Sequence, residues 1–316
     1  MKLIIYMPAL NEEDSITRVI NNLPQILPGI DIIQNLVVDD GSVDNTATLA
    51  AETGAYVVSH GRNRGVGAAF QSAVQFALEN DADILVSIDA DDQFDSKEIP
   101  MLVAPILAGK ADMVAGNRFA RGAPENMPRL KYWGNNVVSK ILRYASGQKF
   151  QDVSCGFRAY NHESLLRLNL FGEFTYTHET ILSLIYQGQR VLEQPITVRY
   201  YPGRESRLAK SVLMYALQTS KIIFRVMLDY RPLQVFGTLG GILIFIGAAF
   251  TLYLLGYYAV TQSFTPYKSF GFIGLGFFIF GLLVLLIALI ADMINRIRIN
   301  QNRQIYLIKK FKYEKK

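Results

Sequence analysis

Two aspartates, Asp89 and Asp91, lie two residues apart in the run ILVSIDADDQFD, after an apolar stretch typical of a buried strand. Carboxylates at this spacing can hold a hard divalent cation against a diphosphate. Asp92 and Asp95 add further negative charge to the same segment. The alternative is a solvated acidic turn that caps a helix near Lys97, and the run itself does not decide between the two.

A second acidic pair lies in VVDDGSVDNT, where Asp39 and Asp40 follow another apolar stretch. Gly41 permits a tight turn, and Ser42 is expected to cap a helix whose N-terminal amides favour negative groups. A carboxylate at this place can accept a hydrogen bond from a nucleobase N–H or a ribose hydroxyl. Turn chemistry alone also explains Gly41 and Ser42, so the functional interpretation depends on the two aspartates.

Residues 1 to about 116 alternate short apolar runs with helical stretches. The runs are LIIYM, NLVVDD, AYVVSH, DILVSID and ADMVAG; the helical stretches include Glu12 to Leu23, capped by Asn11, and Gly67 to Glu79. This alternation predicts a mostly parallel sheet with helices on both faces. Ligands of such sheets bind beyond the carboxyl ends of the strands. The polar loops after the first, second and fourth runs are therefore expected to share one edge.

The glycine-rich segment GRNRGVGAAF superficially matches a phosphate-binding loop. It is not the dinucleotide fingerprint, because GxGxxG would follow the first strand, where this chain has MPALNEED.

The second half of the chain changes character. Helices are expected at Tyr132 to Tyr144 and near Thr177 to Gln187, with a strand in VLEQPITVRYY. Two apolar runs follow, Leu233 to Val260 and Phe270 to Ala291, each long enough at about 1.5 Å per residue to cross a hydrocarbon core of about 30 Å. We expect two transmembrane helices, preceded by an interfacial helix over Leu208 to Leu228. An amphipathic helix packed on the soluble domain is the alternative for that segment.

Charge and hydropathy agree with a membrane protein. Net charge is +5, the pI is near 9.1 and mean hydropathy is +0.18. The connector TQSFTPYKS holds only Lys268, whereas the flanks of the apolar runs hold Lys221, Arg225, Arg231, Arg296, Arg298, Arg303 and the tail KKFKYEKK. Because these lysine and arginine residues flank lipid-spanning runs, they argue against nucleic acid as the partner. The positive-inside rule places the N-terminal domain and the tail in the cytoplasm, with the connector outside.

The lone cysteine, Cys155, excludes an intrachain disulfide and any CxxC metal spacing. We expect it to be a small core residue rather than a nucleophile, because no histidine is near it in the sequence.

Six motifs, PALNEED, VVDDGSVDNT, GRNRGVGAAF, DADDQ, GNRF and GFRAY, resemble in order and spacing those of the family 2 glycosyltransferases with the GT-A fold. With two C-terminal membrane helices, the chain resembles the polyprenyl-phosphate glycosyltransferases in particular, a group that includes dolichol-phosphate mannose synthase and bacterial undecaprenyl-phosphate glucosyltransferases. The resemblance covers essentially the whole chain. It implies an α/β fold: a GT-A catalytic domain with a Rossmann-like mixed sheet, then an interfacial helix and two transmembrane helices.

The resemblance also implies the donor site. The nucleotide pocket would be lined by Pro8, Leu10, Asn11 and Glu12, and Asp39 or Asp40 would contact the base or ribose. Asp89 and Asp91 would bind Mg²⁺ or Mn²⁺ with the donor diphosphate.

The acceptor side is implied in the same way. Gln93 would lie beside the sugar or the acceptor phosphate, so that Asp91, Gln93 and Arg118 form the catalytic set. The cations expected to hold phosphates are Arg118, Arg129, Arg204, Arg207 and Lys210. The segment GRESR departs from the family pattern, since Arg207 stands where lysine is usual; arginine still binds phosphate through a bidentate fork.

These expectations describe a metal-dependent, inverting enzyme. It would transfer a sugar from a UDP- or GDP-hexose to dolichyl or undecaprenyl phosphate, with assembly as a homotetramer possible by resemblance. The expected domains are a catalytic domain at 1–205, interfacial helices at 206–230, a two-helix membrane region at 231–295 and a basic cytoplasmic tail at 296–316. Two alternatives stay open: a processive polysaccharide synthase, and a non-catalytic membrane scaffold that binds nucleotide.

Overall fold

The computed structural model describes residues 1–124, 127, 129–170, 176–199, 224, 227–228 and 231–313, without the side chains of 129–131 and 145. The chain separates into two units. One comprises Met1–Thr219 with Gln304–Lys316, and the other comprises Ser220–Arg303.

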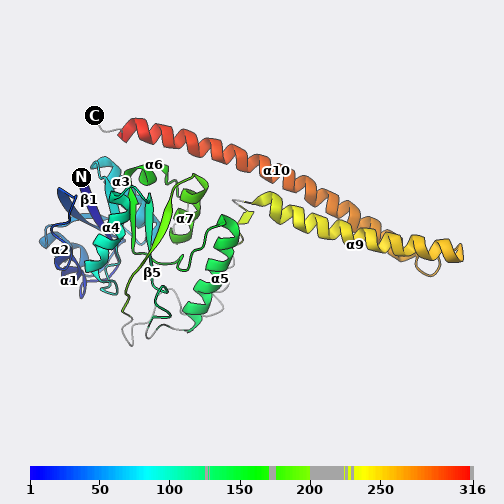
Figure 1. Cartoon of the computed structure of the whole chain (residues 1–316), viewed down its shortest axis with the longest axis horizontal. Helices are drawn as coiled ribbons and strands as arrows, with labels where there is room; N and C mark the ends of the chain where they lie inside the picture. Colours follow the sequence, from blue (N-terminus) through cyan, green and yellow to red (C-terminus); the bar gives the residue numbers. More distant parts are fainter. Residues whose placement is uncertain are drawn as a thin grey trace. The chain divides into compact units, whose positions relative to one another are not determined.

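The first unit is built on a seven-stranded sheet in the order β3-β2-β1-β4-β6-β5-β7 (Figure 1). Pairing is parallel except at β6, which runs antiparallel to both of its neighbours. The strands are β1 (Lys2–Ala9), β2 (Ile32–Asp39), β3 (Tyr56–Ser59), β4 (Ile84–Ser87), β5 (Met113–Asn117), β6 (Arg158–Asn161) and β7 (Val191–Pro195). The prediction of a mostly parallel sheet is confirmed.

Helices cover both faces of this sheet, as the alternation of the sequence predicts. Leu3, Ile5 and Met7 of β1 pack into one apolar core with residues of α1 and α4. On the opposite face, the Tyr6 ring lies 6.1 Å from that of Phe70 in α3. Within the described part of residues 1–219, the helices and the one 3₁₀ turn are α1 (Ile16–Asn21), α2 (Thr46–Glu52), α3 (Val66–Glu79), η1 (Ser96–Glu98), α4 (Ile99–Leu107), α5 (Arg129–Ser146), α6 (His162–Arg167) and α7 (Thr177–Tyr186).

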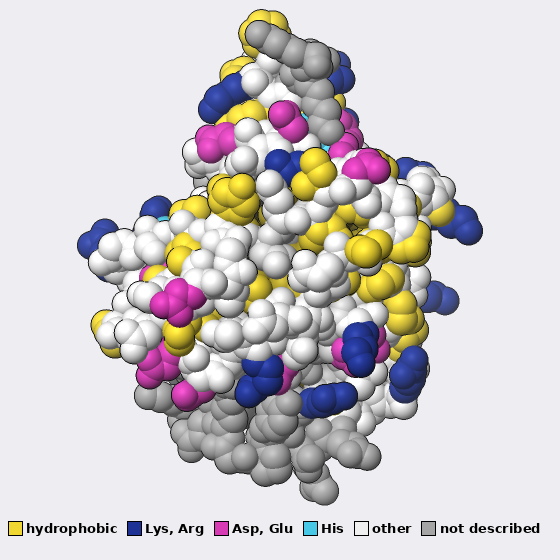
Figure 2. Space-filling model, turned by 90° about the vertical axis from the view of Figure 1, so that its left-hand side faces the viewer, with side chains coloured by type: hydrophobic (Ala, Val, Ile, Leu, Met, Phe, Trp, Pro, Cys, Tyr) yellow, Lys and Arg dark blue, Asp and Glu magenta, His cyan; other side chains and the backbone are white. Residues whose placement is uncertain are grey.

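The charged side chains of the first unit are mixed on the face seen in Figure 2. Lysine and arginine lie among aspartate and glutamate there, with apolar side chains between them. The net positive charge is therefore not gathered into a basic patch on this face.

The second unit contains α9 (Pro232–Thr261) and the part of α10 (Lys268–Tyr313) that ends at Arg303; the remainder of α10 belongs to the first unit. Both helices are long and apolar enough to cross a membrane. They approach closely at glycines: a Cβ added to Gly247 would lie 2.7 Å from the Gly274 carbonyl oxygen. Both predicted apolar runs lie within these helices. The predicted tail at 296–316 is part of α10 as far as Tyr313, and the predicted interfacial helix falls almost entirely outside the described residues.

Candidate active site

The loops that follow β1, β2 and β4 lie at one edge of the sheet. Ala9 pairs with Asp39, and Tyr6 pairs with Ser87, so the three strands end side by side. Because β6 is antiparallel, its first residue, Arg158, pairs with Ser87 at the same edge. The expectation that the polar loops share an edge is confirmed, and the beginning of β6 joins them.

The first two loops are joined by hydrogen bonds between their polar residues. The backbone N–H of Asn11 donates to Ser42 Oγ at 2.9 Å, and the N–H of Val43 donates to Asn11 Oδ1 at 2.9 Å. Asn11 adopts a positive φ of 52° to do so. Glu12 is attached in the same way, through its N–H to Thr46 Oγ1 at 2.8 Å.

This linkage corrects two predictions about helix caps. Ser15 precedes α1 and Asn45 precedes α2, whereas Asn11 and Ser42 were the expected caps. The physical reason is that their side chains satisfy backbone groups of the opposite loop, which a cap sequence alone does not distinguish from a helix start. Pro8 and Leu10, also predicted for the nucleotide pocket, are half-buried in the same region.

The two aspartates at the end of β2, Asp39 within the strand and Asp40 directly after it, have different partners. Asp40 accepts from the N–H groups of Arg64 at 3.0 Å and Gly65 at 2.7 Å, and its Oδ1 lies 2.7 Å from His60 Nδ1. Asp39 accepts from the N–H of Ser42 at 3.0 Å. The carboxylate of Asp40 is therefore engaged in fixing the glycine-rich segment to the end of β2.

Gly41 makes this packing possible. It has a φ of +83°, and an added Cβ would lie 2.6 Å from the carbonyl carbon of Arg62. Both its conformation and its surroundings exclude a side chain.

The acidic loop after β4 has divided roles. The N–H of Gln93 donates to Asp91 Oδ1 at 3.1 Å, and Asp92 forms an ion pair with Arg18 at 2.9 Å. Asp95 accepts from the N–H of Lys97 and caps η1. The acidic-turn interpretation therefore holds for Asp95, and Asp92 is engaged by Arg18. Asp89 and Asp91 remain the candidate metal ligands.

Asp89 lies against Gly156, which precedes β6. A Cβ built on Gly156 would lie 3.0 Å from Asp89 Oδ1 and 3.3 Å from Oδ2. The absence of a side chain at Gly156 therefore makes room for the Asp89 carboxylate. The described residues contain no group of three or more His, Cys, Asp or Glu side chains that could hold a metal. Mg²⁺ commonly takes one or two carboxylates and completes its shell with phosphate and water. The pair Asp89 and Asp91 fits that mode of binding.

Arg118 follows β5 and forms a buried ion pair with Asp152. Its Nε donates to Asp152 Oδ2 at 2.6 Å, and its Nη2 donates to Asp152 Oδ1 and to Ser154 Oγ, both at 2.8 Å. Burial alone would raise the pKa of Asp152, but the charge and hydrogen bonds of Arg118 hold that pKa below its usual range. Asp152 therefore fixes the guanidinium in one orientation.

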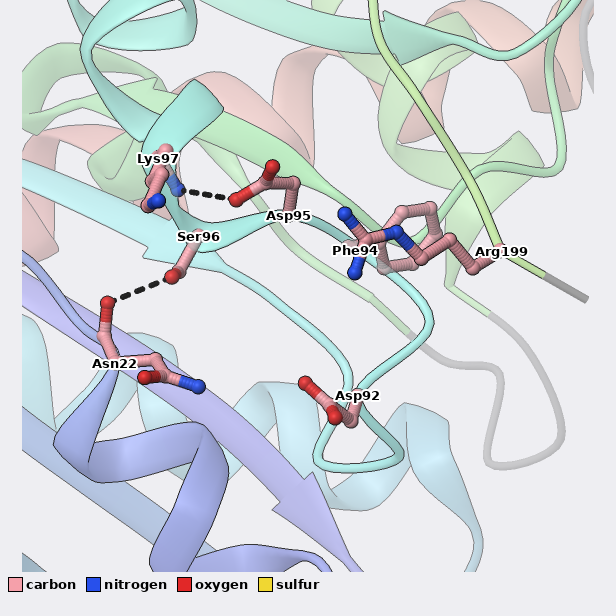
Figure 3. Close-up of a pocket in the computed structure, with 7 residues that line it drawn as sticks. All are labelled: Asn22, Asp92, Phe94, Asp95, Ser96, Lys97 and Arg199. Carbon is pink, nitrogen blue, oxygen red and sulfur yellow. Dashed lines mark hydrogen bonds between the residues drawn. The ribbon is translucent and has the colours of Figure 1, made fainter. Parts of the chain in front are cut away.

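A hollow of about 180 Å³ lies beside the acidic loop, where Arg199 follows β7 (Figure 3). The N–H of Arg199 donates to the carbonyl of Gln93 at 2.9 Å. The hollow is smaller than the roughly 300–1,000 Å³ of typical small-molecule sites. It is lined by Asn22, Asp92, Phe94, Asp95, Ser96, Lys97 and Arg199.

The cations predicted for the acceptor are less fully placed. Arg129 is the first residue of α5, and its side chain is not among those described. Arg204, Arg207 and Lys210 lie outside the described residues.

Sequence reasoning missed the residues that support the predicted ones: His60, Asp152, Gly156, Arg158 and Tyr176. The motif GFRAY was recognised as part of a pattern, but nothing in it indicated that Arg158 would be fully buried. The expectation for Cys155 is supported, because burial raises the pKa of its thiol to about 12.

The chain is similar in sequence to known proteins. The glycosyltransferase AglJ of Haloferax volcanii is 28% identical over 306 residues, covering 95% of this chain and 96% of that protein. Polyprenol monophosphomannose synthase of Mycolicibacterium smegmatis is 29% identical over 209 residues, an alignment that covers 61% of this chain and 76% of that protein.

A solved structure is similar in fold. It is glucosyl-3-phosphoglycerate synthase from Mycobacterium tuberculosis in complex with Mn²⁺, UDP and glucosyl-3-phosphoglycerate, with a TM-score of 0.53, 21% identity and coverage of 72% of this chain and 79% of that one. The expected GT-A fold is confirmed. The family model described as glycosyl transferase family 2 matches residues 4–168, and the chain therefore belongs to that family.

Proposed function

We propose that this glycosyltransferase moves a hexose from a nucleoside diphosphate sugar to a polyprenyl phosphate at the cytoplasmic leaflet, with inversion at the anomeric carbon. The observation that carries the proposal is the pair Asp89 and Asp91 at the carboxyl edge of the sheet. Two further facts support it: the same chain contains α9 and α10, and a relative of similar sequence is named a polyprenol monophosphomannose synthase.

The donor would be bound by the loops after β1, β2 and β4. Asp89 and Asp91 would hold Mg²⁺ or Mn²⁺, which supplies positive charge to the leaving diphosphate when bound. We assign the contact with the base or ribose to Asp39, because Asp40 is engaged with His60 and the glycine-rich segment. Pro8, Leu10, Asn11 and Glu12 would form the wall of the nucleotide pocket.

The acceptor needs no strong general base. A phosphate monoester has a second pKa of about 6 and is mostly dianionic near neutral pH, so its oxygen is already nucleophilic. The protein's task is to hold that oxygen in line with the anomeric carbon and to offset the repulsion between two phosphate groups. We assign this role to Arg118, whose guanidinium is oriented by Asp152. Gln93, Arg129, Arg204, Arg207 and Lys210 complete the proposed acceptor side.

The test is a panel of UDP- and GDP-sugars incubated with the membrane-embedded protein, Mn²⁺ or Mg²⁺ and either dolichyl or undecaprenyl phosphate, followed by mass analysis of the lipid. We expect one donor to yield a glycosylated polyprenyl phosphate. Asp91→Asn should lower transfer by at least about 100-fold, because it removes a metal-ligand charge at the leaving group. Asp95→Asn is the matched control, since Asp95 caps η1 in the same loop, and it should stay within a few-fold of wild type.

Two results would contradict the proposal. If no donor gives a lipid-linked product, the proposed reaction is wrong. If folded Asp91→Asn retains transfer, the metal-site assignment is wrong.

A further inference from the structure

The segment Val153–Phe157 precedes β6 and lies against the acidic loop at the edge of the sheet. Ser87 pairs with Arg158 in an antiparallel register, and two further steps along that register bring Asp89 opposite Gly156. The Cβ positions described above agree with this placement, since both carboxylate oxygens of Asp89 lie within 3.3 Å of a Cβ built on Gly156. The backbone at Gly156 is therefore one wall of the space that Asp89 occupies.

This wall is held by the guanidinium of Arg158, a fully buried side chain. Its Nε donates to the carbonyl of Cys155 at 2.7 Å, and its Nη2 donates to the carbonyl of Val153 at 3.0 Å. Its Nη1 donates to the Thr177 carbonyl at 2.6 Å and to Thr180 Oγ1 at 2.7 Å. One side chain thus ties the segment to the beginning of α7, and the planar fork of arginine suits several fixed acceptors at once.

Other contacts hold the same segment from its remaining sides. The N–H of Gly116 in β5 donates to the carbonyl of Phe157 at 2.8 Å. The rings of Phe157 and Phe94 are 5.4 Å apart. The hydroxyl of Tyr176 lies 2.9 Å from Ser87 Oγ and 3.5 Å from the carbonyl of Gly156. With so many contacts, the segment cannot retreat easily from Asp89.

We propose that Val153–Phe157, held by Arg158, positions the Asp89 carboxylate for metal binding, and that Gly156 is required because any side chain there displaces it. The inference rests on the proposed function, in which Asp89 is a metal ligand. Metal–ligand distances tolerate deviations of only about 0.2 Å. A contact at 3.0 Å forces a neighbour to move by a few tenths of an ångström, and the contacts that hold Val153–Phe157 oppose movement of the backbone.

The experiment is Gly156→Ala in the full-length protein. Mn²⁺ binding is measured by the loss of the free-ion EPR signal, in the presence of UDP and, separately, of GDP. We expect the dissociation constant of Mn²⁺ to rise about 10-fold or more, as is usual when a group that orients a ligand is altered. Thermal unfolding is followed on the same samples. Arg158→Lys, which keeps the charge but loses the fork, should weaken Mn²⁺ binding in the same direction.

Leu78→Ala is the matched control, because it truncates a buried side chain of α3 that lies outside the core cluster of Cys155 and Phe157. Its Mn²⁺ affinity should equal that of wild type. The inference is overturned if Gly156→Ala binds Mn²⁺ within about two-fold of wild type, or if Leu78→Ala weakens binding equally. A wild-type protein that binds Mn²⁺ but glycosylates no polyprenyl phosphate would instead overturn the proposed reaction, and the EPR comparison would still decide the role of Gly156.

Discussion

His178 lies in the first turn of α7, next to the buried Arg158 that supports the acidic loop. Burial lowers its pKa to about 4, and the charge of Arg158 acts in the same direction, while Asp152 opposes it. The folded pKa is below the ordinary value of 6.5, so the unfolded chain binds a proton before the folded chain does. Stability from neutral His178 is therefore complete above pH 6.5 and is lost as the pH falls toward 4.

We predict that protonation of His178 causes part of the fall in the free energy of unfolding as the pH is lowered. Between pH 7.5 and 4.5, wild type should lose up to about 2.5 kcal/mol more than His178→Gln, at about 1.4 kcal/mol per pKa unit. The measurement is urea unfolding of the detergent-solubilised protein at several pH values. Taking the difference between the two proteins cancels the titration of carboxylates that both share. Parallel curves for wild type and His178→Gln would show that His178 is not the group responsible.

At the scale of elements, the sequence predicts those parts whose pattern is local. Strands β1, β2, β4 and β5 and helix α3 appear where apolar runs and helical spacing indicate them. Strand β6 was not predicted, because it is four residues long and begins with an arginine whose burial depends on acceptors in α7 and in the preceding segment. Its antiparallel direction also depends on contacts distant in sequence.

The candidate site also contains features that the sequence indicates and features that only tertiary contacts determine. Asp89, Asp91, Asp39 and Asp40 stand out in the sequence, because each pair follows an apolar run of a predicted parallel sheet, at the edge where ligands bind. Asp39 has a local partner in Ser42, whereas the partners of Asp40 lie 20 to 25 positions away and Asp152 lies 34 positions from Arg118. Residue type indicates which groups can act, but tertiary contacts decide which of them are engaged elsewhere.

The end of α10 contacts α6 within the first unit, and this contact leads to a prediction for the element. The Tyr306 ring lies 4.3 Å from the guanidinium carbon of Arg167, and its hydroxyl donates to Glu163 at 3.3 Å. Lys309 Nζ donates to the carbonyl of Leu168 at 2.6 Å, and burial lowers the pKa of this lysine. From Gln304 to Tyr313, the residues predicted to be a basic tail are therefore helical and contact the region of α6 through Tyr306 and Lys309.

Tyr306→Ala should release this end from α6, because it removes both the cation–π contact and the hydrogen bond. Contacts of this kind contribute on the order of 0.5–2 kcal/mol, so amide exchange should rise several-fold in residues 304–313 and in α6. Hydrogen–deuterium exchange with mass spectrometry measures both segments together. Tyr306→Phe is the control: it keeps the ring and should retain most of the protection. Equal protection in wild type and Tyr306→Ala would show that the contact is not maintained in solution.

For the whole molecule, the question is which side of the membrane the first unit occupies. Basic residues flank α9 and the end of the apolar part of α10, whereas the connector 262–267 contains no lysine or arginine. The positive-inside rule then favours a cytoplasmic catalytic domain and an external connector. This orientation is also what the proposed reaction needs, since nucleotide sugars bear charges that do not cross a bilayer unaided.

Cysteine labelling in intact cells can test this orientation with little background, because Cys155 is fully buried and its thiol pKa is raised to about 12. A membrane-impermeant maleimide should label Ser263→Cys in the exposed connector and should not label Asn300→Cys, which lies on α10 beyond the apolar run. Permeabilised cells should label both variants, which shows that both thiols are reactive. The reverse pattern in intact cells would place the first unit outside, and the proposed cytoplasmic transfer would then be wrong. If only Ser263→Cys is labelled in intact cells and wild type is not labelled, the chain crosses the membrane twice. The catalytic domain and the helical C-terminal end are then on the same side of the membrane.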